Sequence, residues 1–449
     1  MRRRAAWLLL FAAALLLRLA HASILWVEEC YPAAAAIQML HGKLPYRDFF
    51  FDKPPLSALV YLLWGAMTGW PLRLAGALFV VLCSWLAWRL ARQLWSEHEA
   101  WIAAGALAFF LTFDTPSAAI PLAPDMLMIA PHLAAVYFAS RARPLLAGLC
   151  CALAFLTNTK AVFVLAVCLA WNPALAPWTL AGFAPALLAV PMMWEQVFRF
   201  GQLYAGDSFV ANPWTTGLSR TLSWTAFHAA AVIPSAYFLY KERSKRLLVW
   251  IAFSFIAVSL GARFFPRYYF QLLPAAAIAA SRGLTLLPRK WAIAAALLLL
   301  LPLARYGPRF AQVNEQWADT AMYRDSREAS AIINSNAGPS DTILIWGYRP
   351  DILVLTRLAL GTPWLDSQPL TGVLADRHLF DTHETIPEQA AANRRHLATL
   401  RPTWIVDGLG PYNKKLAISG YADLTAFLGS YRQVARTQGC RIYRLTPYP

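Results

Sequence analysis

Charged residues are scarce in this chain of 449 residues, at 14% of the sequence, whereas hydrophobic residues make up 58%. A soluble globular protein carries about 25% charged residues, so the composition excludes an ordinary soluble enzyme. The apolar residues fill most of the first 305 positions and thin out afterwards. This distribution predicts a polytopic α-helical membrane module, residues 1–305, followed by a water-soluble domain, residues 306–449.

Several familiar site motifs are also missing. The six cysteines show neither a disulfide framework nor a Cys/His metal spacing. No glycine-rich phosphate loop follows a predicted strand, so we assign no nucleotide site. No internal repeat is visible, which weakens the case for a transporter built from inverted halves.

Acidic residues are the rarer charge, and the formal net charge is +16. A strongly basic chain suggests nucleic acid, but no basic face with a reading helix is present, so we predict no nucleic-acid partner. The basic clusters instead lie at the ends of apolar spans, as the positive-inside bias produces. They are Arg2–Arg4, Arg89 with Arg92, Arg141 with Arg143, Lys241–Arg246, and Arg282 with Arg289 and Lys290.

The spans predict about eleven transmembrane helices with a cytoplasmic N-terminus. The first, residues 5–25, could be a signal peptide ending at Ala20-His21-Ala22, but Arg18 interrupts it and we prefer an uncleaved helix. Residues 145–171 could be one span or two short spans broken at 157–160. The charge bias and the cost of an unpaired Lys160 at mid-bilayer favour two. An odd number of spans then places the soluble domain outside, together with loops 26–71, 114–125, 195–221 and 261–267.

Two further elements follow from residue patterns. Residues 57–68 are too short to span, so we expect an interfacial helix on the outer face. After residue 305 the pattern predicts a helix over 325–336 and strands over 342–346, 403–406 and 441–444, which indicates a small α/β domain.

The first outer loop is the most polar stretch of the first three hundred residues. Charges beside a membrane are costly to place and usually functional. In the predicted topology this loop shares one face of the membrane with Asp114 and Asp125 of the second loop, and with Lys160, Arg263 and Arg267. A carboxylate can deprotonate an acceptor, and Arg or Lys can hold a lipid-linked phosphate. A simpler interpretation is that each charge pairs with a neighbour at the headgroup level.

The motifs of this loop resemble a known family. Five short motifs are similar to those of GT-C fold glycosyltransferases. In the first loop they are Glu28-Glu29, Gly42-Lys43-x-Pro45-Tyr46-Arg47-Asp48 and Lys53-Pro54-Pro55. Later in the chain they are Pro124-Asp125 and Gly261-x-Arg263-Phe264-x-Pro266-x-Tyr268. The nearest branch is the bacterial one related to protein O-mannosyltransferases and lipid A aminoarabinose transferases. Ile345-Trp346-Gly347-Tyr348 in the soluble domain is also similar to these proteins. Two positions depart from the family pattern: Glu28 replaces a usual Asp, and Arg267 replaces a frequent His.

The resemblance implies a bacterial inner-membrane enzyme, embedded among membrane lipids, that transfers a sugar from a polyprenyl phosphate to an extracytoplasmic lipid, glycan or protein, with inversion. It assigns Glu28 or Glu29 as the general base or as an acid that orients the acceptor, and Asp125 as the second acidic element. Lys53 would bind the donor phosphate, with Arg263, Arg267 and Lys160 as weaker candidates. Tyr46, Arg47, Asp48 and Asp52 would belong to the substrate loop. Some relatives hold a divalent metal, for which Glu28 and Asp125 are the candidate ligands.

Two other classes of function stay open. One is a lipid-linked saccharide transporter or flippase, which would place its charges inside the spans. The other is a non-catalytic envelope assembly subunit, which is supported in the sequence only by Glu28 in place of Asp. Turnover of a lipid-linked donor by the purified protein separates both from an enzyme.

Overall fold

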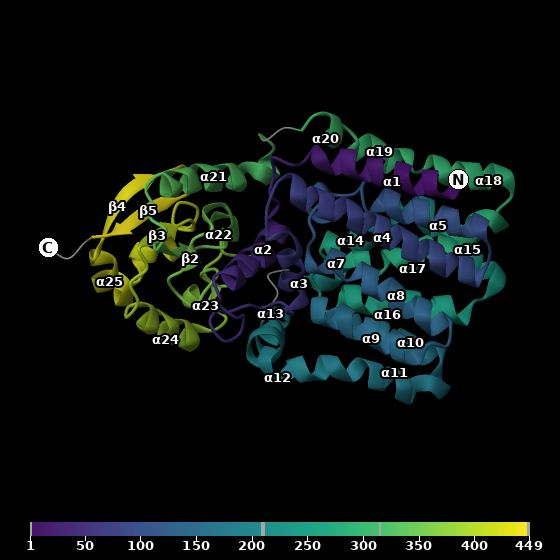
Figure 1. Ribbon diagram of the computed structural model, residues 1–449, viewed down its shortest axis with the longest axis horizontal. Coiled ribbons are helices and arrows are strands. Elements are labelled where there is room, and N and C mark those ends of the chain that lie inside the picture. Colours follow the sequence, from purple (N-terminus) through teal and green to yellow (C-terminus); the bar gives the residue numbers. More distant parts are fainter. Residues whose placement is uncertain (1, 208–211, 314–315, 447–449) are drawn as a thin grey trace.

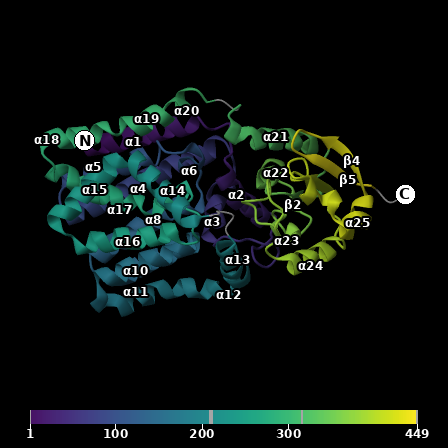
Figure 2. The ribbon, with the colours of Figure 1, turned by 180° about the vertical axis from the view of Figure 1, so that it is seen from behind.

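A helical bundle and a smaller α/β unit make up the chain in a computed structural model, which describes residues 2–207, 212–313 and 316–446. Figures 1 and 2 show the N-terminus at one end of the bundle and the α/β unit at the other. The helices of the bundle run along its long axis and pack side by side (Figure 1). They are α1 (Arg2–Leu19), α4 (Trp70–Leu94), α5 (Glu97–Phe110), α8 (Ile129–Ser140), α9 (Pro144–Thr157), α10 (Val162–Trp171), α11 (Ala176–Phe183), α15 (Ala229–Glu242), α16 (Lys245–Ser259), α17 (Leu273–Leu286), α18 (Arg289–Leu297) and α19 (Leu300–Tyr306).

The predicted count of eleven spans is not confirmed. Within the described ranges, two helices are long and apolar enough to cross a membrane, Trp70–Leu94 and Pro173–Gly206. A third is obtained if Pro213–Phe227 and Ala229–Glu242, which meet at an angle of 94°, are one bent span. Many bundle helices are shorter than the roughly 20 residues of a straight span; α9 and α17 have 14 residues each. Breaks at prolines and polar residues explain the short lengths.

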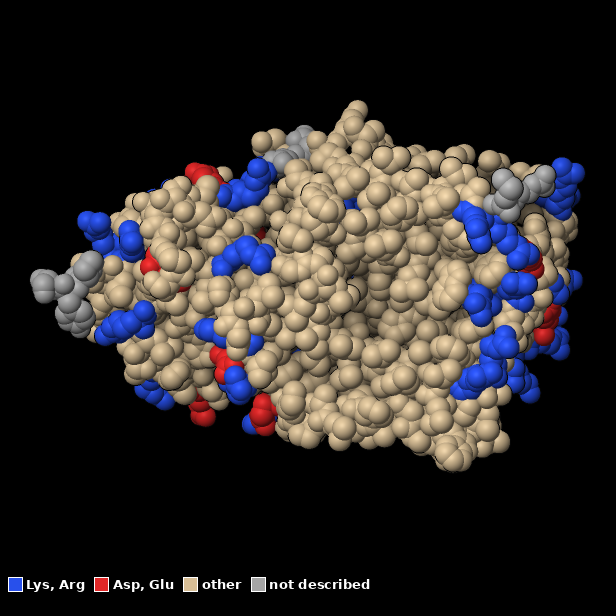
Figure 3. All heavy atoms as spheres, in the orientation of Figure 1, with Lys and Arg blue, Asp and Glu red and all other residues tan. Residues whose placement is uncertain are grey.

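Charge is distributed unevenly over the surface. Figure 3 shows, on the face that it draws, an uncharged area across the middle of the bundle, with Lys and Arg gathered at the end opposite the α/β unit. Large apolar side chains of the bundle are exposed, including Leu82, Leu149 and Leu188. An apolar belt between charged ends is the surface that a lipid bilayer requires.

Of three predicted elements, one is confirmed and two take a different form. The break in 145–171 occurs as predicted, at Asn158 between α9 and α10. The predicted interfacial helix over 57–68 is two short turns, α3 (Leu56–Leu59) and η1 (Val60–Trp64). The predicted loop 195–221 is mostly helical, formed by a π-helix (Trp194–Arg199), α13 (Phe200–Gly206) and α14 (Pro213–Phe227), and its residues 208–211 lie outside the described residues. The Asn212 side chain accepts a hydrogen bond from the backbone N–H of Thr215 and thereby starts α14.

The α/β unit contains one mixed sheet of order β2-β1-β3-β5-β4. Strands β1 (Thr342–Trp346), β3 (Trp404–Asp407) and β5 (Arg441–Leu445) lie where the residue pattern predicts them. Strands β2 (Ala359–Leu360) and β4 (Tyr431–Arg436) were not predicted from the residue pattern. The two strands β2 and β3 flank β1 in parallel, and β5 pairs antiparallel with both β3 and β4. Helices α21 (Ala321–Asn334), α22 (Pro350–Thr356), α24 (Pro387–Leu397) and α25 (Thr425–Gly429) complete it, and α21 matches the predicted helix over 325–336.

The α/β unit is held against the first outer segment, which begins with α2 (Val27–Leu40). The Gln38 side chain donates to Leu358 O at 3.1 Å and accepts from Leu360 N at 2.8 Å. Farther along, Phe50 N donates to Pro363 O at 2.8 Å. These backbone contacts fix the register between the two segments, so the α/β unit and the first outer segment meet in one arrangement.

Candidate active site

The first turn of α2 separates the two adjacent glutamates. Glu29 is fully buried and accepts hydrogen bonds from Arg73 with both carboxylate oxygens, at 2.5 and 3.1 Å. Its Oε1 also accepts from the backbone N–H of Trp26 at 3.0 Å, which caps the helix. Arg73 in turn donates to the carbonyls of His21 and Ile24. Successive helical residues point in different directions, so Glu28 is left half-buried on another face of α2.

Glu28 meets two residues from distant parts of the chain. Arg267 Nη1, from the 3-10 helix η6 (Pro266–Gln271), donates to Glu28 Oε1 at 2.5 Å. The same guanidinium places Nε 3.5 Å from Asp125 Oδ2. Asp125 lies in α7 (Pro124–Leu127) of the second outer loop. The structure therefore joins the first, second and fourth predicted outer loops at one arginine.

The break between α9 and α10 supplies the next part of this cluster. Asn158 Nδ2 donates to Asp125 Oδ1 at 2.9 Å, and Asn158 Oδ1 accepts from Lys160 N at 3.1 Å. Lys160 Nζ lies 3.1 Å from the centroid of the Tyr268 ring, a close cation–π contact. Its ammonium group is buried and makes no hydrogen bond within the described parts of the chain. Lys160 thus lies beside Arg267 and Asp125 with unused donors.

Lys53 of the first loop is held by neighbours within that loop. Its ammonium group is 2.8 Å from Asp52 Oδ2 and 5.7 Å from the ring centroid of Tyr31. The Tyr46 hydroxyl donates to Lys53 O at 2.6 Å and fixes this corner of the loop. The side chain of Lys53 is 38% exposed, which leaves its ammonium group open to a ligand.

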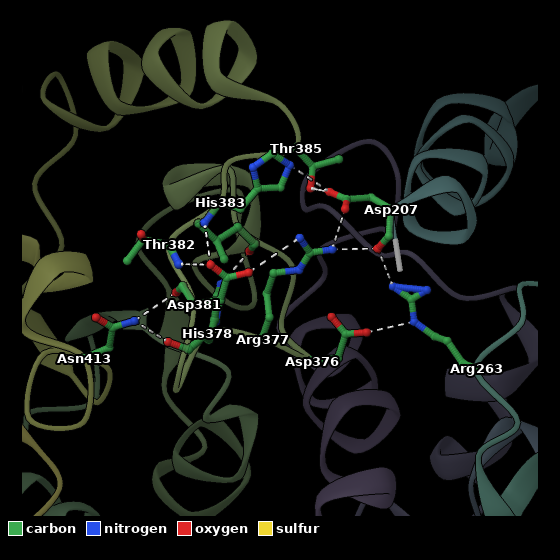
Figure 4. Close-up of polar contacts among 11 residues, drawn as sticks. Asp207, Arg263, Asp376, Arg377, His378, Asp381, Thr382, His383, Thr385 and Asn413 are labelled. Carbon is green, nitrogen blue, oxygen red and sulfur yellow. Dashed lines mark hydrogen bonds and ion pairs between the residues drawn. The ribbon is translucent and has the colours of Figure 1, made fainter. Parts of the chain in front are cut away.

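Arg263 is engaged elsewhere, as Figure 4 shows. Its Nε donates to Asp376 Oδ2 at 2.8 Å, and its two terminal nitrogens donate to Tyr204 O and Asp207 O. Asp207 also binds Arg377 at 2.9 Å and thereby reaches the α/β unit. Arg263 is 1% exposed. It holds the segment before α14 against the α/β unit.

Arg47 and Asp48 lie at the surface of the first loop. They pair with each other at 2.7 Å, and Asp48 also accepts from Leu44 N. The hydrogen bonds from Arg47 lower the pKa of the Asp48 carboxyl to about 2. Lys43 donates to Leu360 O. These residues shape the loop and its contact with the α/β unit.

The donor set gives little support to a divalent metal. Glu28 and Asp125 share the guanidinium of Arg267, so a cation already lies between the two candidate ligands. Across the described residues, no group of three or more His, Cys, Asp or Glu side chains could hold a metal ion. Metal dependence stays a prediction, and the chemistry below uses the side chains of the chain alone.

Four residues of this region were given no functional role in the sequence analysis. Asn158 orients Asp125, and Arg73 orients the first turn of α2. Gln196 accepts from Phe51 N at 2.8 Å and donates to Tyr46 O at 3.1 Å, which anchors the first loop. Tyr348 of the α/β unit stacks on Tyr31 with centroids 5.6 Å apart. For Asn158 and Arg73, the sequence feature that could have revealed them is a polar side chain inside an apolar stretch.

Comparison with known proteins defines the class. The fold is that of the GT-C glycosyltransferases, which are integral membrane proteins. The structure superposes on ArnT from Cupriavidus metallidurans in the apo state with a TM-score of 0.64, and on the same protein bound to undecaprenyl phosphate with a TM-score of 0.63. Sequence identity is 15% in both cases, and each match covers 98% of this chain and 98% of that chain. The apo oligosaccharyltransferase of Archaeoglobus fulgidus matches with a TM-score of 0.50 at 13% identity, over 98% of this chain and 74% of that chain.

The sequence also matches a family directly. Residues 52–194 match the family described as Dolichyl-phosphate-mannose-protein mannosyltransferase. No curated protein matches the chain by sequence. Together with the fold, the family match confirms the resemblance to the superfamily of protein O-mannosyltransferases and lipid A aminoarabinose transferases.

Proposed function

We propose that this protein is a membrane glycosyltransferase that moves a sugar from a polyprenyl-phosphate donor to an acceptor outside the cytoplasm, with inversion at the anomeric carbon. One observation carries the proposal: the guanidinium of Arg267 joins Glu28 and Asp125 from separate loops, beside the buried ammonium of Lys160. Acids and cations at one point are what removal of a proton and departure of a phosphate require.

In the proposed reaction, an acceptor hydroxyl or amine attacks the anomeric carbon. The new glycosidic bond forms as the bond between that carbon and the phosphate oxygen breaks, and polyprenyl phosphate leaves with the bonding electrons. Glu28 takes the acceptor proton. We prefer Glu28 to Glu29 because both oxygens of Glu29 are occupied by Arg73 in a buried pair. Asp125, held by Asn158, orients Arg267 and the acceptor.

The cations have separate roles. Lys53 is exposed enough to meet the phosphate first, and Lys160 has three donors without a hydrogen-bond partner in the described structure. Arg267 has five N–H donors and uses only some of them on Glu28 and Asp125. A phosphate that binds Arg267 competes with Glu28 for the guanidinium, so donor binding frees the base. Arg263, closed off by Asp376 and two carbonyls, has a structural role in this scheme.

The relatives support this assignment of class. The ArnT structure contains undecaprenyl phosphate, and the Archaeoglobus fulgidus protein is an oligosaccharyltransferase. We further propose the eleven-span arrangement with a cytoplasmic N-terminus in a bacterial inner membrane. The N-terminus and the α/β unit lie at opposite ends in Figure 1, which supports a periplasmic position for that unit in the proposed topology. The division at residue 305 belongs to the same proposal.

Mass spectrometry of envelope glycolipids, glycans and glycoproteins, with and without the gene, tests the function. A glycosylated product should vanish on deletion and return with the wild-type gene. The Glu28→Gln gene should not restore it although the protein is inserted normally. Purified protein should release polyprenyl phosphate from its lipid-linked sugar. Movement of intact donor without release would indicate a flippase, and neither activity would indicate an assembly subunit.

A further inference from the structure

Four arginines, which we call the arginine cluster, lie at the end of the bundle opposite the α/β unit. Arg89 and Arg92 belong to the last two turns of α4, and Arg141 and Arg143 lie in the turn between α8 and α9. Arg141 Nη1 donates to Gln93 Oε1 at 3.1 Å, which joins this turn to the end of α4. Figure 3 shows Lys and Arg gathered at this end of the molecule.

Aromatic rings hold the side chains of the cluster in place. The guanidinium carbon of Arg89 lies 5.2 Å from the ring centroids of both Trp85 and Tyr137. Arg89 Nη2 also donates to the Tyr137 hydroxyl at 2.7 Å, and Arg141 lies 6.0 Å from the same ring. A cation–π contact orients a guanidinium without neutralising its charge. Two like charges therefore share one tyrosine.

No carboxylate of the described chain pairs with the arginine cluster. The carboxylates at this end of the bundle have other partners. Glu97 pairs with Arg3, and Arg282 pairs with both Glu99 and Glu242. Like charges this close together repel, and the folded chain supplies no anion to compensate. The positive-inside bias requires only that cations be present at this end, so their convergence on one ring points to an anion from outside the chain.

Exposed apolar side chains accompany the cluster on two helices. They are Leu78, Leu82 and Trp85 on α4, and Leu145, Leu149 and Leu153 on α9. Spacings of three and four residues keep each set on one face of its helix. The α4 set is in line with Arg89, and the α9 set begins two residues after Arg143. Apolar stripes that meet cations fit a ligand with both acyl chains and an anionic head group, which a free anion is not.

We propose that the arginine cluster is a binding site for an anionic phospholipid with two phosphates, of the cardiolipin type. The two arginines of α4 bind one phosphate, the two of the α8–α9 turn bind the other, and acyl chains lie along the two stripes. Arginine forms charge-assisted hydrogen bonds with phosphate oxygens, and basic surfaces between membrane helices bind head groups of this class. Four guanidiniums without a counterion match two phosphates better than one. The site goes beyond the proposed function and does not depend on it.

Native mass spectrometry of the purified full-length protein in detergent, titrated with cardiolipin, tests the site. The double variant Arg141→Gln, Arg143→Gln removes two exposed cations, and its dissociation constant for cardiolipin should rise at least about tenfold. The matched control is Arg289→Gln, Lys290→Gln, which removes the same charge from exposed residues at the start of α18. The control should bind cardiolipin like the wild type, and thermal unfolding should be unchanged in both double variants.

Three comparison ligands define the chemistry of the site: phosphatidylethanolamine, undecaprenyl phosphate and inorganic phosphate. Cardiolipin should bind more tightly than phosphatidylethanolamine, and its affinity should fall as the salt concentration rises, because salt screens exposed charges. Wild-type affinity in the Arg141, Arg143 variant would overturn the proposal, and so would equal weakening in both double variants. Displacement of cardiolipin by inorganic phosphate would indicate a site for a free anion. Tighter binding of undecaprenyl phosphate that depends on these arginines would assign the site to the donor lipid, and either result refutes a phospholipid site.

Discussion

The two adjacent glutamates of α2 should respond in opposite ways to removal of their charge. Glu29→Gln changes neither size nor shape, so the effect comes from the charge. Glu29 is 0% exposed and its partner Arg73 is 1% exposed, so the substitution leaves a buried guanidinium without a counterion. Breaking a buried pair on one side costs about 3–5 kcal/mol. The amide oxygen of Gln can still accept one bond from Arg73, so we expect the lower end, about 3 kcal/mol.

Glu28→Gln should leave stability almost unchanged. Its side chain is 26% exposed and its pairing with Arg267 is open to solvent screening, so the pair contributes little to folding. Loss of a general base costs about 10²–10⁴ in rate. Glu28→Gln should therefore fold and insert normally, yet fail to restore the envelope product. Glu29→Gln should unfold at a lower temperature but keep most of its activity per folded molecule.

The assay pairs thermal unfolding in detergent with complementation of the deletion strain, scored by mass spectrometry and normalised to inserted protein. Arg73→Gln is the control, because it breaks the same pair from the other side and should resemble Glu29→Gln. Loss of activity without loss of stability in Glu29→Gln, together with full activity in Glu28→Gln, would refute the assignment. The base would then be Glu29, and the buried pair would have to open during turnover.

Three further outcomes follow from the same contacts. Asn158→Ala removes the hydrogen bond to Asp125 Oδ1. It should lower complementation at least tenfold while the protein still inserts. The control, Asn393→Ala, changes a residue far from this cluster and should have no effect on product formation. Burial raises the pKa of Asp366 to about 7. The hydrogen bonds from Gln368 lower this pKa, and the negative charge of Asp52 raises it further. Because the native state binds the proton more tightly than the unfolded chain, stability should fall from about pH 4 to pH 7 by about 4 kcal/mol and then level off; Asp366→Asn should remove this slope in unfolding temperature. Arg263→Gln should expose the segment around Asp207 to limited proteolysis more than Arg267→Gln does, and equal cleavage would contradict the structural role of Arg263.

The resting arrangement of Arg267 has a consequence for the order of events. In the absence of substrate its guanidinium contacts Glu28 and Asp125 together. A carboxylate oxygen that accepts hydrogen bonds from a guanidinium has fewer lone pairs free for an acceptor's proton. An incoming phosphate offers the guanidinium another anion and competes with Glu28 for its N–H donors. Release of Glu28 would then occur only with a donor in place.

The sequence alone was sufficient for the membrane module, the first-loop motif and three strands of the sheet. These features depend on local patterns: apolar runs, the period-2 alternation of strands, and charges that flank spans. The helix break at Asn158 followed from the same logic, because a lysine at mid-bilayer is costly. The family resemblance also came from contiguous residues, Lys53-Pro54-Pro55 among them. The number of spans did not follow, since short and bent helices are not distinguished by composition.

Only the tertiary structure decided which charged residues meet. Glu28 and Glu29 are neighbours with the same side chain, yet helix geometry turns one toward Arg73 and the other toward Arg267. Arg263 and Arg267 are four residues apart, and the positive φ of Ala262 and Phe264 helps to send them to different partners. Tyr348 reaches the first loop from more than three hundred residues away. A pairing of this kind depends on distance in space, and spacing along a chain does not contain it.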